Sequence, residues 1–136
     1  MIKFFSNTSF RLANKDRISL WLLDVIKNEE KSLNEISYNF CSDSELLKVN
    51  KEFLNHDTLT DIITFDYSGL SGLSGEVLIS TERVKENAQE FSQVFNVELR
   101  RVMVHGVLHL CGFKDKTDAD KLIMTQKEDF YLSRFR

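Results

Sequence analysis

The sequence predicts a single α/β domain, of the α+β kind, in which about five helices pack on a mixed sheet of about four strands. The chain has 136 residues, 42% of them hydrophobic and 29% charged, which is typical of one globular domain. Segments of strand and helix periodicity follow one another in the order βαβαββααα. The chain contains no proline and no long linker, so we expect residues 1–136 to form one domain.

The first strand and helix come before residue 30. Residues 2–5 are rich in aromatic and β-branched side chains, which favours a short strand. Residues 15–29 carry apolar side chains at helical spacing, and Asn14 is the expected N-cap of this helix.

A second strand and helix follow directly. From Ile36 to Cys41, apolar and polar residues alternate, which is the pattern of a half-buried strand. Ser42 or Ser44 is then expected to cap a helix that ends at about Leu54.

The middle of the chain predicts a hairpin. Residues 62–67 and 76–80 are both β-rich. The short Ser-Gly-Leu segment between them can form a tight connection, so the two strands should pair antiparallel.

The second half of the chain is mostly helical. A helix from Thr81 is expected to present one apolar face that includes Phe91 and Val94, and Asn96 is expected to cap the next helix. That helix, over residues 97–111, is apolar on most sides and should be central and buried. A last helix, capped near Asp118, should close the domain.

Composition restricts the partners and the location of the protein. The formal net charge is −3, so a nucleic-acid partner would need a local basic patch. The two cysteines, Cys41 and Cys111, form no CxxC pair, which favours a reducing, cytosolic setting. The N-terminus lacks a signal-peptide pattern, and no apolar run reaches the ~18 residues of a membrane span. We therefore expect a cytoplasmic protein without a membrane partner.

Two of the three histidines, His105 and His109, lie four residues apart on the predicted buried helix. Side chains at this spacing point the same way and can bind one metal ion. Gly112 can end the helix in a left-handed turn that brings Asp115 back as a third ligand. A lone histidine on an apolar helix is usually a hydrogen-bonded core residue, but the pair, the glycine and the carboxylate together favour one divalent metal ion per chain, with Zn²⁺ expected.

Three protein ligands leave a fourth position for water, which is typical of catalytic zinc sites. The spacing HxxxHxxGxxD also occurs in the zinc proteases of the metzincin group. Those enzymes carry a glutamate as general base at the position of Gly106. Because glycine cannot accept a proton, a metalloprotease is only an alternative interpretation.

The same residues resemble the YbeY family of bacterial ribosomal-RNA maturation factors. The family motif is His-Gly-x-Leu-His-Leu-x-Gly-Tyr/Phe-Asp-His, and residues 105–115 match it except at the last two positions. Thr60–Phe65 and Gly75–Ile79 are similar to two further family segments, so the resemblance covers about residues 35–116. It implies a cytoplasmic, metal-dependent endoribonuclease that cleaves single-stranded RNA in ribosomal-RNA maturation and ribosome quality control. The implied partners are ribosomal RNA and the small ribosomal subunit.

The sequence departs from the family pattern at two positions. Asp115 occupies the position of the family's third histidine ligand, and Leu54 that of an arginine expected to contact phosphate. His56 and Lys51 are candidates to replace that arginine, although His56 is more simply interpreted as a residue of the turn Asn55-His-Asp57.

Residues near the motif are candidates for RNA binding and catalysis. Arg101, Lys114 and Lys116 could form a basic rim that contacts phosphates. In the alternative, Arg101 pairs with an acidic neighbour and the lysines are solvated. The nucleophile would be the metal-bound water, and Asp61 is a candidate for the general base.

The remaining charged residues of this region are interpreted as solvated faces: Glu98, Arg100 and the charges from Asp118 to Asp129. The protein could also be a non-catalytic ribosome-assembly factor that binds RNA and holds a structural metal.

Overall fold

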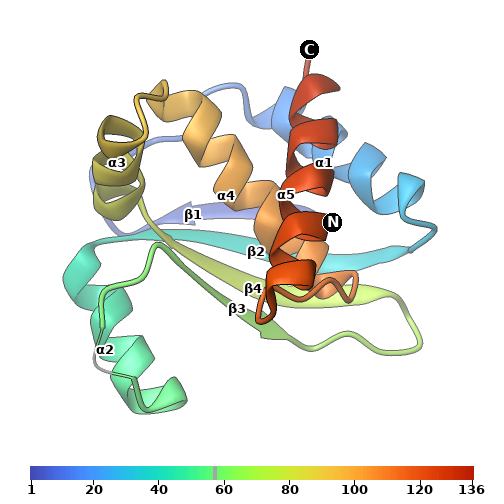
Figure 1. The fold of residues 1–136 in the computed structure, drawn as a ribbon. Helices are drawn as coiled ribbons and strands as arrows, with labels where there is room; N and C mark the ends of the chain where they lie inside the picture. Colours follow the sequence, from blue (N-terminus) through green and yellow to red (C-terminus); the bar gives the residue numbers. More distant parts are fainter. Residues whose placement is uncertain (57) are drawn as a thin grey trace.

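The computed structural model describes residues 1–56 and 58–136 and contains, within them, four strands and five helices in the predicted order (Figure 1). The strands are β1 (Ile2–Ser6), β2 (Leu33–Cys41), β3 (Ile62–Asp66) and β4 (Leu73–Ser80). The helices are α1 (Lys15–Asn28), α2 (Asp43–Leu54), α3 (Thr81–Glu90), α4 (Phe95–Leu110) and α5 (Asp118–Ser133). The predicted α/β architecture with one mixed sheet is confirmed.

The four strands form one sheet in the order β1-β2-β4-β3. The first three strands of this order run parallel, whereas β3 runs antiparallel to β4. The predicted hairpin is therefore confirmed, with Ile63 opposite Leu78. Strand β4 begins at Leu73, three residues earlier than predicted, because Leu73 also pairs with Leu33 of β2.

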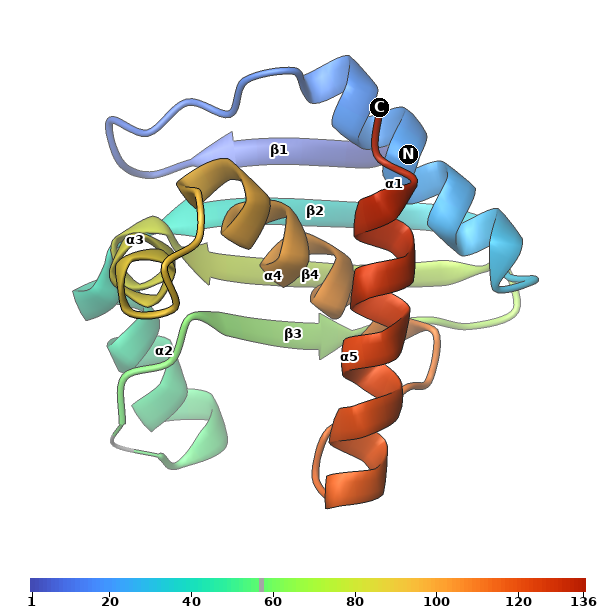
Figure 2. The same ribbon diagram turned by 45° about the horizontal axis from the view of Figure 1, so that its top comes forward.

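Helices α1, α4 and α5 cover one face of the sheet (Figure 2). Helix α4 lies in the middle of this layer, and most of its apolar residues are buried, as predicted. The buried Tyr38 of β2 donates a hydrogen bond to the Met103 carbonyl of α4 at 2.7 Å. Helix α4 is thus fixed against the sheet along its length, which gives the side chains on its remaining face a rigid support.

Gly106 allows α4 to approach the sheet closely. A Cβ atom at this position would lie 2.9 Å from Cγ1 of Val77 on β4 and 3.2 Å from Cδ1 of Ile62 on β3. Both distances are shorter than ordinary carbon contacts. Gly106 therefore contributes to packing, because the absence of a side chain lets α4 lie close to β3 and β4.

Two helix starts differ from the sequence-based expectation. Asn14 stands at the N-cap of α1, but it adopts a left-handed conformation, which Asn tolerates, and its side chain makes no capping hydrogen bond. Helix α4 starts at Phe95 after Val94, and not at Asn96. The ring of Phe95 packs edge-on against Phe10, so tertiary packing fixes this start.

The other caps use hydroxyl side chains. Ser42 forms a capping box with Glu45 at the start of α2, as one of the two predicted alternatives. Thr117, and not Asp118, caps α5 through the N–H of Asp120.

The apolar face expected to continue after Thr81 ends earlier than predicted. Helix α3 stops at Glu90, and the side chains of Phe91 and Val94 are exposed. Ser92 adopts a positive φ of 54°, so the chain turns before these residues can continue the helical face.

None of the helices within the described residues is long and apolar enough to cross a membrane.

The turn predicted around His56 begins with Asn55, whose left-handed conformation ends α2. Asp57, the last residue of that predicted turn, lies outside the described residues.

Candidate metal centre

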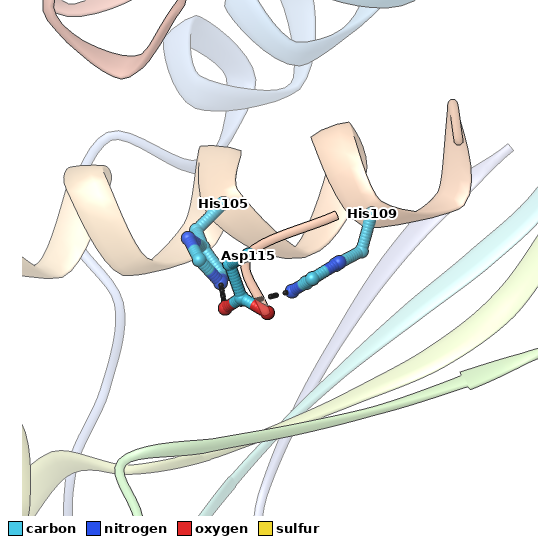
Figure 3. Close-up of side chains that lie close together, drawn as sticks. All are labelled: His105, His109 and Asp115. Carbon is cyan, nitrogen blue, oxygen red and sulfur yellow. Dashed lines mark ion pairs between the residues drawn. The ribbon is translucent and has the colours of Figure 1, made fainter. Parts of the chain in front are cut away.

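The two histidines of α4 and the loop after the helix converge on one point (Figure 3). Nε2 of His105 lies 3.2 Å, and Nε2 of His109 3.4 Å, from Oδ2 of Asp115. Two ligands placed about 2.0–2.1 Å from a tetrahedral ion lie about 3.3–3.4 Å apart. Asp115 therefore already has the separation from each histidine that one such ion requires, and the ligand atoms of all three side chains lie within 4.8 Å of one another.

The loop after α4 returns Asp115 by way of Gly112. Gly112 has a φ of 107°, a conformation that disfavours any residue with a side chain. Its N–H donates to the His109 carbonyl at 3.0 Å, and the N–H of Phe113 donates to the Leu108 carbonyl at 3.0 Å. These bonds satisfy the last carbonyl groups of the helix and turn the chain back, so the predicted left-handed helix end is confirmed.

Both imidazole rings are held through the nitrogen that faces away from Asp115. Nδ1 of His109 lies 2.9 Å from the Phe113 carbonyl oxygen. Nδ1 of His105 lies 2.6 Å from Oε2 of Glu128 on α5. A carbonyl oxygen can only accept, so the proton of His109 is on Nδ1 and the Nε2 lone pair is free for an ion. Two imidazole nitrogens and one carboxylate oxygen form a donor set suited to a divalent metal.

The charges around His105 favour its protonated form in the protein without an ion. Burial alone would lower the pKa of His105, but the hydrogen bond to Glu128 and the negative charges of Glu128, Asp115 and Asp61 outweigh burial and raise it. The same negative charges would attract a bound cation.

The candidate metal centre opens into a pocket of about 850 Å³. Five carboxylates and three cationic side chains are among the residues that line it. The carboxylates belong to Asp61, Asp66, Glu98, Asp115 and Glu128, and the cations to Arg101, Lys116 and Lys121. Without a metal ion, the charged side chains of the lining are thus more negative than positive.

The structure brings some of the predicted RNA-binding residues to the pocket and not others. Lys116 lines the pocket, whereas Lys114 is exposed and is not among the described lining residues. Arg101 lines it too, but its guanidinium lies 3.0 Å from Oε1 of Glu128 and 2.6 Å from Oδ1 of Asp129. Arg101 is therefore paired as in the alternative interpretation.

Four further predicted positions lie in α2 or between α2 and β3. Asp61 lines the pocket, and burial raises the pKa of its carboxyl group. Leu54 also lines the pocket, whereas His56 and Lys51 are not among the described lining residues. Neither of the two candidates for the phosphate contact therefore reaches the pocket.

The interpretation of Glu98 and Glu128 as solvated residues is wrong. Each is only 7% exposed. Burial raises the pKa of Glu98 and, together with the smaller effects of Asp61 and Glu128, outweighs the positive charge of Arg101, which lowers it. Glu98 lies on the same helical stripe as Arg101 and His105, and this spacing is a signal that the sequence contains.

Lys121 was also missed. It follows Thr117, the cap of α5, by four residues and lines the pocket. Its position depends on how α5 packs on α4, so no local pattern marks it.

Comparisons with known proteins agree with the resemblance found in the sequence. The family described as Endoribonuclease YbeY matches residues 4–136. The chain is 50% identical over 135 residues to the Endoribonuclease YbeY of Flavobacterium johnsoniae, covering 99% of this chain and 97% of that one. It is 46% identical over 134 residues to that of Christiangramia forsetii, covering 98% and 94%.

A solved structure has the same fold. The solution structure of TM1509 from Thermotoga maritima is similar with a TM-score of 0.70 and 26% identity, and the match covers 99% of this chain and 89% of that one. The metal-ligand spacing, the fold and the sequence relatives thus agree, and the chain belongs to the YbeY endoribonuclease family.

Proposed function

We propose that this protein is a metal-dependent endoribonuclease that cleaves single-stranded RNA in the cytoplasm during ribosomal-RNA maturation and ribosome quality control. The observation that carries the proposal is the convergence of His105, His109 and Asp115 in an open pocket. The relatives at 46–50% identity that bear the name Endoribonuclease YbeY support the reaction class. On this proposal, the substrate is ribosomal RNA and the partner is the small ribosomal subunit.

The proposed ion is Zn²⁺, held by Nε2 of both histidines and a carboxylate oxygen of Asp115. Three protein ligands suit a catalytic site because one coordination position stays open. When bound, such an ion supplies Lewis-acid chemistry, since it polarises a phosphoryl oxygen and lowers the pKa of water. The protein contributes the fixed direction of the two imidazole rings, which the hydrogen bonds at Nδ1 set.

The charges of the pocket suggest how RNA is held. The lining has more carboxylates than cations, so a phosphate entering without the ion meets net repulsion. A divalent cation reverses part of this charge. Lys116 and Lys121 are exposed, line the pocket and form no ion pair with another described residue. We propose these two lysines as the phosphate contacts, since Arg101 is already paired and Lys114 lies outside the lining.

Asp61 is the proposed proton acceptor for the attacking nucleophile. It lines the pocket, its charge interacts with that of His105, and burial raises the pKa of its carboxyl group, which makes it a stronger base. Asp61→Asn should therefore lower kcat while leaving the metal affinity within about threefold of the wild type, because Asp61 is not in the ligand set.

The metalloprotease alternative lacks a general base in the expected place. Gly106 packs against Val77 and Ile62, and even a Cβ atom there would be too close to both side chains. A glutamate at this position would have to displace the side chains of Val77 and Ile62. We therefore do not favour peptide hydrolysis.

The test compares wild type and His109→Ala on a fluorescent single-stranded RNA, each first stripped with a chelator and then supplied with zinc, manganese or magnesium. We expect cleavage by the wild type that returns with metal and is absent in His109→Ala. RNA binding without cleavage under every metal would favour the non-catalytic assembly factor. Casein hydrolysis without RNA affinity would instead favour the protease.

A further inference from the structure

The two histidine ligands are fixed by chemically different groups. His109 is held by the backbone carbonyl of Phe113, which no substitution can remove. His105 is held by the side chain of Glu128, which lies 23 residues later in the chain on α5. Its Oε2 is 2.6 Å from Nδ1 of His105, and the residue is only 7% exposed. One ligand therefore depends on a side chain from another helix, and the other does not.

Glu128 is in turn fixed by Arg101, one helical turn before His105 on α4. Nη1 of Arg101 lies 3.0 Å from Oε1 of Glu128, so the two carboxylate oxygens have different partners. Nη2 of Arg101 lies 2.6 Å from Oδ1 of Asp129, which is largely exposed. A buried carboxylate without such partners would be strongly unfavourable. The guanidinium therefore holds the Glu128 carboxyl group in the direction of the histidine.

We propose that Glu128 is a positioning residue of the metal centre: it holds His105 in the tautomer and orientation that direct Nε2 at the ion, and Arg101 acts by orienting Glu128. This inference rests on the proposed metal centre. A carboxylate that accepts the second N–H of a histidine ligand fixes the ring and increases its basicity, and loss of such a partner typically lowers metal affinity 10–100-fold. It also gives α5 a role in the site, to which this helix contributes no ligand.

The proposal changes the expected role of Arg101. A guanidinium whose Nη1 and Nη2 both contact carboxylates has little capacity left for a phosphate. Arg101→Ala should therefore weaken metal binding and leave the salt dependence of RNA binding unchanged. Replacing a residue that contacts RNA phosphates would instead reduce the salt dependence of RNA binding and leave metal affinity unchanged.

The first experiment measures Zn²⁺ affinity by competition with a chromophoric chelator at one pH. We compare the wild type with Glu128→Ala, Glu128→Gln and Asp129→Asn. We expect a 10–100-fold loss for Glu128→Ala and a smaller loss for Glu128→Gln, which keeps an acceptor oxygen but not the charge. Asp129→Asn is the matched control, since Asp129 contacts Arg101 but not His105, and should stay within about twofold of the wild type.

The second experiment does not need a metal. In ¹⁵N-histidine NMR spectra of the chelator-stripped protein, His105 of the wild type should show protonated Nδ1, as should His109. Glu128→Ala should abolish the signal of the hydrogen-bonded Nδ1–H of His105 and leave that of His109 unchanged as an internal reference. Because Glu128→Gln has nearly the same shape, it separates this effect from a general loss of folding.

The outcomes that would overturn the proposal are specific. Wild-type affinity in both Glu128 variants, or an Nδ1–H signal of His105 that does not respond to Glu128→Ala, would show that Glu128 only packs. An equal loss in Asp129→Asn would show that the effect is not transmitted through His105. A wild type that binds no metal would defeat the proposed function, and the metal-free NMR comparison would still decide the role of Glu128.

Discussion

Replacing Asp115 by alanine tests the third ligand directly. The carboxylate oxygen lies 3.2 and 3.4 Å from the two Nε2 atoms, and 42% of the side-chain surface is exposed. Its described ion pairs are with the two histidines alone. An exposed pair of this kind contributes only ~0–1 kcal/mol to folding. Asp115→Ala should therefore barely change the stability of the metal-free protein.

The effect on the metal-bound protein should be larger. Loss of one of three protein ligands should weaken Zn²⁺ binding at least tenfold, and a tenfold change corresponds to about 1.4 kcal/mol. When free zinc is well above the dissociation constant, the stabilisation by zinc falls by the same amount. For a chain of this length, that loss corresponds to about 3–6 °C in Tm. The predicted signature is a smaller Tm shift on adding zinc, with an almost unchanged Tm in chelator.

The assay combines thermal unfolding in chelator and in zinc with a chelator competition for affinity. Asp115→His should restore the affinity, because its imidazole reproduces the histidine of the related family. Asp115→Asn is the matched control, which keeps the size of the side chain but removes the charge. If Asp115→Ala binds zinc as tightly as the wild type, Asp115 is not a ligand and the assignment of the site is wrong.

Three further predictions concern packing, charge and RNA. Gly106→Ala should lower the free energy of unfolding, measured by urea denaturation, by about 1–2 kcal/mol, because overpacking against Val77 outweighs the gain in helix propensity. Unchanged stability would contradict the close approach of α4 to the sheet. Burial raises the pKa of Glu98 above the ordinary glutamate value of 4.5. Ionisation of Glu98 therefore destabilises the fold as the pH rises above 4.5. Glu98→Gln should raise Tm at pH 8 and much less at pH 4. Lys121→Ala should reduce the salt slope of RNA binding by about one phosphate contact, whereas Lys114→Ala, the matched control outside the pocket, should not; equal slopes in both variants would remove Lys121 from the interface.

The elements and the grouping of the three proposed metal ligands could be predicted because local spacing encodes them. The hairpin pattern gave the pairing of β3 with β4, and the four-residue spacing of His105 and His109 needs only one helix. Gly112 ends that helix through bonds within five residues of itself. Asp115 could therefore be assigned without knowledge of how any two helices pack.

The partners of the ligands could not be predicted in the same way. Glu128 and Arg101 meet across the contact between α4 and α5, and 27 residues separate them in the chain. On α5, Glu128 follows the buried Met124 by four residues and precedes the buried Tyr131 by three, so it lies on the apolar stripe of that helix. A charged residue on such a stripe is a signal of a buried ion pair. The sequence does not show which cation pairs with it.

The arrangement of charge reconciles two demands of a metal-dependent nuclease. Carboxylates are needed to bind the ion and to orient its ligands, but they repel a phosphate backbone. In this pocket, Glu98 and Glu128 are buried and Glu128 is paired with Arg101, whereas Lys116 and Lys121 are exposed. The buried negative charge thus lies in the pocket of the proposed metal centre, where a divalent cation would compensate it, and the two lysines face the solvent. Because the compensation depends on the ion, RNA affinity should depend on metal loading even in a variant that cannot cleave.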